Sequence, residues 1–107
     1  MSSNKLDTIV NANNNQSHWL GVYPPEKQLQ RLAQIPLADY IIATHCPHSW
    51  KNDRNSYNYR TSQQMICENL VSADVFGPYT YRRIAWMIDC NPIVLMNDPK
   101  LKDIVPA

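Results

Sequence analysis

Apolar positions recur at helical spacing in two stretches of the first half of the chain. Within residues 6–10 and 29–33, apolar side chains lie three and four positions apart, which predicts two short amphipathic helices. We expect the second helix to begin at Pro24-Pro25, because proline suits the first turn of a helix, where an amide hydrogen has no partner within the helix. Pro36 removes a donor in the middle of the pattern, so we expect it to break that helix.

The clearest helical pattern lies in the second half of the chain. Thr61 and Gln64 have the spacing of a capping box, in which two side chains satisfy the free amides at a helix start. Gly77-Pro78 predicts the end of that helix and the beginning of another, and Asp98-Pro99 predicts a last helical turn before Val105. The buried face of the first helix is expected at Met65, Ile66, Leu70 and Ala73, and that of the second at Tyr81, Ile84, Ala85 and Ile88.

Two short apolar segments, residues 40–43 and 93–96, are too short for periodicity to decide between helix and strand. The expected fold is mainly α: one small globular domain, residues 1–107, of four to five short helices. If the two segments pair as strands, the fold is α+β instead. A chain of 107 residues fits one domain with an ordinary hydrophobic core and leaves no room for two.

The composition is that of a globular protein with almost no net charge. Hydrophobic residues make up 44% of the chain, charged residues 18%, and the formal net charge is +1 at pH 7. This balance creates no overall field toward nucleic acid or an anionic membrane. Three cysteines without a C-x-x-C spacing favour a reducing compartment. With no signal-peptide pattern and no long apolar run, we expect a cytoplasmic protein that does not associate with membranes.

The sequence carries no motif of a known catalytic class. Its two glycines, Gly21 and Gly77, are far apart, whereas phosphate-binding loops need several glycines close together. Motifs of metalloproteases, serine hydrolases and calcium-binding loops are missing, and no close pair of carboxylates suggests acid–base chemistry. We therefore expect a protein that is not an enzyme and needs no cofactor.

The strongest candidate surface is the segment 50–60. It has no apolar periodicity, so we interpret it as a loop, and long loops in small domains are often functional. It also combines tryptophan, tyrosine and arginine, the residues typical of interface hot spots. We expect a protein-binding module, an adaptor or inhibitor of the kind found in phages and other mobile elements. Its predicted partner-binding residues are Trp50, Lys51, Arg54, Tyr57, Tyr59 and Arg60. In a purely structural alternative, Trp50 and one tyrosine pack onto the core.

A second hypothesis is nucleic-acid binding. Tyr79, Arg82 and Arg83 begin a predicted helix that follows another helix, an arrangement faintly like a helix-turn-helix. Together with the segment 50–60, they could stack on bases and neutralise phosphates. Because few cations are available, this binding would be weak and strongly dependent on salt. In the structural alternative, Trp86 lies under the aliphatic stems of the two arginines.

A third hypothesis is a zinc or thiol site at His45, Cys46 and His48. These residue types are suitable zinc ligands, and Cys67, Cys90 or His18 could complete a tetrahedral site. A histidine could also activate the thiol of Cys46, with Asp39 or Asp53 orienting the base. The spacing matches no established zinc motif, so we expect no bound metal and rank this hypothesis below the other two.

Overall fold

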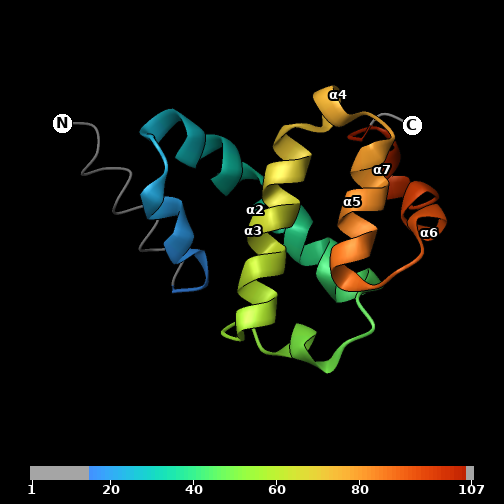
Figure 1. The fold of residues 1–107 in the computed structure, drawn as a ribbon, viewed down its shortest axis with the longest axis horizontal. Coiled ribbons are helices and arrows are strands. Elements are labelled where there is room, and N and C mark those ends of the chain that lie inside the picture. The colour runs from blue at the N-terminus through green and yellow to red at the C-terminus, as the bar shows by residue number, and fades with distance from the viewer. Residues whose placement is uncertain (1–14, 106–107) are drawn as a thin grey trace.

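The computed structural model describes residues 15–105, and within them the secondary structure is entirely helical (Figure 1). The helix expected within residues 6–10 lies outside the described residues. In chain order the elements are the 3₁₀ helix η1 (Asn15–Val22), α2 (Pro25–His45), the 3₁₀ helix η2 (Ser49–Asn52), α3 (Tyr57–Val71), α4 (Ala73–Phe76), α5 (Tyr79–Ile88), α6 (Pro92–Met96) and α7 (Pro99–Lys102). The mainly α prediction is confirmed, but the described part holds six α-helices where four to five were expected, and the two possible strands do not form.

Helix α2 begins at Pro25, as predicted, but it continues through Pro36 to His45. The expected break is therefore wrong. An interior proline costs a helix about 3 kcal/mol, since it removes one hydrogen bond and crowds the preceding turn. Burial of apolar side chains before and after Pro36 opposes this cost, because only a continuous helix keeps them on one face. These side chains are Ile35, Ala38, Ile41 and Ile42. Segment 40–43 is thus helical.

Helix α3 begins at Tyr57, four residues before the predicted start. The Oγ of Ser56 accepts a hydrogen bond from the amide of Tyr59 at 3.1 Å and caps the helix. Thr61 lies inside the helix, where its hydroxyl donates to the carbonyl of Tyr57 at 2.9 Å. The capping box predicted at Thr61 is wrong, because Ser56 satisfies the free amide one turn earlier. The predicted loop over 50–60 is correspondingly reduced to η2 and the turn that follows it.

The boundaries in the second half follow the predictions more closely. Gly77 has a φ of 55° and separates α4 from α5, whose buried face is the predicted one. The helix predicted to run from Thr61 to Gly77 is divided, however, because α3 ends at Val71 and the four-residue α4 follows it. Segment 93–96 belongs to α6, which Asn91 caps by accepting from the amide of Ile93 at 2.9 Å. Asp98 caps α7 in the same way, which confirms the last helical turn.

Helix α3 contacts both α2, which crosses behind it in Figure 1, and α5, which lies beside it, while α6 contacts both α5 and α7. One hydrophobic cluster joins these elements. Its fully buried members include Leu20, Ile41, Ile42, Ile66, Ile88 and Leu95. No helix within residues 15–105 is long and apolar enough to cross a bilayer.

Candidate functional site

The predicted loop does not form one continuous binding surface. Tyr59 is only 3% exposed, and its hydroxyl donates to Oδ1 of Asp39 on α2 at 2.8 Å. Burial and this hydrogen bond raise the pKa of Tyr59 well above its usual range. Trp50 is half-buried, with its ring edge-on to Tyr59 at 6.4 Å between centroids and stacked with His48 at 5.9 Å. We therefore remove Tyr59 from the predicted partner-binding residues and regard Trp50 mainly as a packing residue.

The remaining loop residues point to different neighbours. Arg54 places Nη2 2.7 Å from Oδ2 of Asp39, so its guanidinium already has a carboxylate partner. Lys51 is half-buried. Tyr57, by contrast, is 80% exposed and lines a shallow hollow with Arg60. Of the predicted set, Tyr57 and Arg60 are the pair that still border a common hollow.

The outer face of α5 matches the second hypothesis in part. Tyr79 and Arg82 are exposed, and the guanidinium of Arg82 makes no ion pair or hydrogen bond within the described residues. Arg83 is held in place: its Nε donates to Oδ1 of Asn69 at 2.6 Å, and its guanidinium carbon lies 4.2 Å from the centroid of the Phe76 ring. The helix that precedes α5 is the four-residue α4, not a full supporting helix after a tight turn. The arrangement is therefore not that of a helix-turn-helix.

The residues of the third hypothesis are held in separate structural contacts. The Nε2 of His45 lies 2.7 Å from Asp98, and the Nε2 of His48 lies 2.7 Å from Asp89. Cys46 is 2% exposed. Burial raises the pKa values of the other two thiols, Cys67 and Cys90, which lowers the thiolate fraction that metal binding or nucleophilic attack would need. Nowhere in the part of the chain that the structure describes do three metal-ligating side chains come together.

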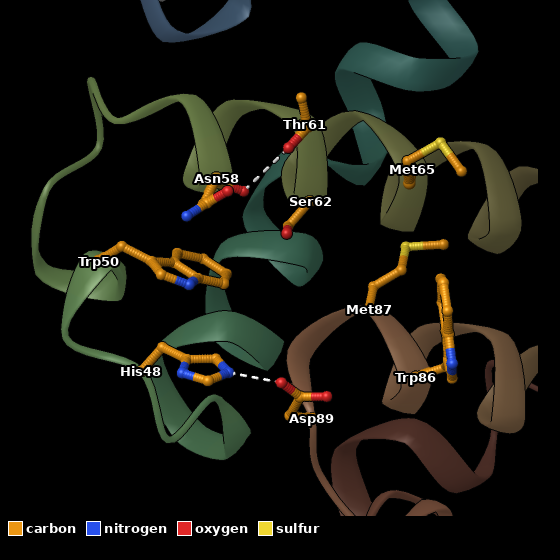
Figure 2. Close-up of a pocket in the computed structure, with 9 residues that line it drawn as sticks. All are labelled: His48, Trp50, Asn58, Thr61, Ser62, Met65, Trp86, Met87 and Asp89. Carbon is orange, nitrogen blue, oxygen red and sulfur yellow. Dashed lines mark hydrogen bonds and ion pairs between the residues drawn. The ribbon is translucent and has the colours of Figure 1, made fainter.

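Two hollows share Met65, Trp86 and Met87 in their lining, and we call the two together the Trp86 groove; Figure 2 shows the first of them, which lies between α3 and α5. The first hollow has a volume of about 570 Å³ and is lined by His48, Trp50, Asn58, Thr61, Ser62, Met65, Trp86, Met87 and Asp89. Figure 2 shows Met65 on α3 and Met87 on α5 at the same side of this hollow, with the ring of Trp86 beside Met87. The second hollow, of about 420 Å³, is lined by the same three residues and by Arg82 and Arg83.

Trp86 is the most exposed large apolar side chain of the described residues, at 82%. The alternative that it lies under arginine stems does not hold. Met65 is 43% exposed, so its predicted place on the buried face of α3 is also wrong. A signal for Trp86 was present in the sequence: on a helix whose buried face contains Tyr81, Ile84 and Ile88, position 86 falls on the opposite side. The position of Met65 beside it depends on how α3 packs against α5.

The groove has different charges at its two ends. At one end Asp89 and His48 form an exposed pair at 2.7 Å. At the other end are Arg82 and Arg83, neither of which contacts a carboxylate within the described residues. The groove therefore combines an apolar centre with one cationic end. No protein-family model, curated protein or solved structure matches this chain, so the geometry of the Trp86 groove is the basis for assigning a function.

Proposed function

We propose that this protein is a small binding module, an adaptor or inhibitor, whose partner is another protein that docks in the Trp86 groove. The observation that carries the proposal is the exposure of Trp86, at 82%, beside the methionine-lined hollow between α3 and α5. Tryptophan is a residue that proteins usually bury for the most part. An exposed tryptophan next to a concave apolar surface is typical of a binding site.

The energetic argument rests on how much surface a partner would cover. An aromatic side chain can bury about 150–250 Å², and each Å² of apolar surface contributes about 25 cal/mol. Covering Trp86 alone would thus contribute a few kcal/mol. Arg82 and Tyr79 lie on the same outer face of α5, one turn and two turns before Trp86 respectively. Tyrosine, arginine and tryptophan are the residues that dominate interface energies.

A protein partner fits the groove better than a nucleic acid. The centre of the groove is formed by thioether and indole groups, and Asp89 at one end would repel a phosphate backbone. The net charge of +1 adds no general attraction for a polyanion.

We propose binding without catalysis, because His45 and His48 already take part in structural contacts with Asp98 and Asp89. We also propose that the protein acts in the cytoplasm, since three free cysteines are typical of a reducing compartment.

The test is affinity purification from a lysate of the source cells with three forms of the protein: wild type, Trp86→Ala and Tyr57→Ala. Tyr57 is the matched control, because it is an equally exposed aromatic residue at 80% and belongs to the predicted loop. We expect one protein to be retained by wild type and Tyr57→Ala and lost with Trp86→Ala, also after nuclease treatment. Retention that depends on Tyr57 and not on Trp86 would contradict the groove, and loss after nuclease would favour nucleic acid.

A further inference from the structure

The two arginines at the cationic end of the Trp86 groove have no carboxylate partner within the described residues. Arg82 is exposed, and its guanidinium has no ion pair or hydrogen bond within the described residues. Arg83 uses its Nε to bind Asn69, and its two terminal nitrogens have no partner in the same part of the chain. At the other end of the groove, the carboxylate of Asp89 already pairs with His48 at 2.7 Å.

We infer that the partner presents an apolar anchor flanked on one side by an acidic side chain, and this inference rests on the proposed function. The apolar anchor lies between Met65 and Met87 against the ring of Trp86, where the lining is apolar (Figure 2). The carboxylate lies beside Arg82 and Arg83, in the adjoining hollow that these arginines share with Trp86. The two hollows meet at Trp86, so one short peptide segment can fill both.

The side chain of Arg83 is already held in a fixed position. The hydrogen bond from Arg83 to Asn69 and the packing of its guanidinium on Phe76 hold the side chain in one position. A held guanidinium loses less conformational entropy when it binds a carboxylate, and its planar donors suit both carboxylate oxygens at once. Asp89 acts in the opposite sense, because its charge disfavours a second acidic residue at the far end. The expected ligand is therefore acidic on one side only.

The test selects binders from a library of random short peptides displayed on phage. Wild type is compared with Arg82→Glu and with Lys27→Glu, a matched charge reversal at an exposed position of α2 that lines neither hollow. We expect wild type and Lys27→Glu to enrich peptides with an apolar residue next to Asp or Glu. Arg82→Glu should weaken binding of such a peptide at least about tenfold, and added salt should weaken its binding to wild type, as it does for exposed charge pairs.

The outcomes separate this inference from the proposed function. Peptides that need Trp86 but show no enrichment of acidic residues, or that bind Arg82→Glu as well as wild type, would overturn the inference and leave the proposed function standing. A selection in which no enriched peptide loses binding with Trp86→Ala would count against the groove itself. The inference would also be overturned if oligothymidylate binds wild type at physiological salt and does not bind Arg82→Glu. The two arginines would then be part of a nucleic-acid-binding site.

Discussion

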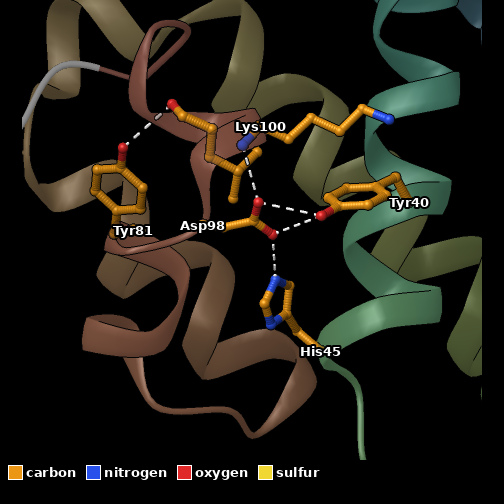
Figure 3. Close-up of polar contacts among 6 residues, drawn as sticks. Tyr40, His45, Tyr81, Asp98 and Lys100 are labelled. Atoms are coloured by element: carbon orange, nitrogen blue, oxygen red, sulfur yellow. Dashed lines mark hydrogen bonds and ion pairs between the residues drawn. The ribbon is translucent and has the colours of Figure 1, made fainter.

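The Nε2 of His45 lies 2.7 Å from Oδ2 of Asp98, and this contact joins the last turn of α2 to the first turn of α7. Asp98 is a buried carboxylate, and the hydroxyl of Tyr40 donates to the same oxygen at 2.8 Å. Its other oxygen accepts from the amide of Lys100 at 2.9 Å (Figure 3). One side chain therefore caps a helix and attaches the C-terminal segment to α2. His45 therefore has a structural role in holding the C-terminal segment against α2.

The first prediction compares the two helix caps of the C-terminal part. Asn91→Ala removes only a cap from α6 and should lower the free energy of unfolding by about 1 kcal/mol. Asp98→Ala removes a cap from α7 and also leaves His45 and Tyr40 without their acceptor, so the loss should be at least about 2 kcal/mol. Urea denaturation of both variants measures the difference. Equal losses would show that the contacts of Asp98 with α2 contribute nothing.

The second prediction concerns pH. Burial alone would raise the pKa of Asp98, but hydrogen bonds from His45, the amide of Lys100 and Tyr40 outweigh it, and the pKa lies below its usual value. The unfolded chain, with a pKa of about 3.9, then takes up the proton first as the pH falls. The stabilisation is present above that value and is lost as the pH falls through the lower pKa of the folded state.

Asp98→Asn tests this, because asparagine keeps the cap and removes the charge. Wild type should be more stable than Asp98→Asn at neutral pH, and the difference should shrink progressively below about pH 4. Thermal melts at a series of pH values give this difference directly. A difference that stays constant into the acid range would mean that the charge of Asp98 adds no stability.

The third prediction contrasts two tryptophans. Trp50 packs against Tyr59 and His48, so Trp50→Ala should lower the free energy of unfolding by about 2 kcal/mol or more. Trp86 is 82% exposed, so Trp86→Ala should change the free energy of unfolding by less than about 0.5 kcal/mol. Chemical denaturation decides the matter. If Trp86→Ala is the more destabilising variant, its side chain is part of the core and the groove as described is absent.

The fourth prediction concerns the two glycines. A Cβ atom at either Gly21 or Gly77 would meet no other atom within 4 Å, so steric contact does not separate them. Gly77, however, has a φ of 55° and a ψ of −132°, a conformation that residues with a side chain rarely adopt. Gly77→Ala should therefore lower the free energy of unfolding by at least about 1 kcal/mol, whereas Gly21→Ala should leave it nearly unchanged. Melting temperatures of the two variants measure this difference. Similar melting temperatures for both would exclude backbone strain as the reason for Gly77.

Features that depend on neighbours along the chain were predictable. Pro25 begins α2, Gly77 ends α4, Asp98 caps α7, and the periodic apolar face of α5 is buried. Each of these follows from a preference that acts within one or two turns. Two local signals failed for the same reason. Pro36 and Thr61 marked boundaries by their chemistry, but the burial of residues on either side of Pro36 and the cap at Ser56 decided otherwise.

The candidate site shows the same division. The sequence by itself determined that aromatic and basic residues gather in segment 50–60 and at the start of α5, and that Trp86 falls opposite the buried face of that helix. Only the tertiary structure decided that Tyr59 is buried in the core and that Arg54 pairs with Asp39. It also decided that Met65, Met87 and Trp86 line one open groove. The physical reason is that exposure depends on which other element covers a side chain. That element lies far away in the sequence, so local pattern cannot specify it.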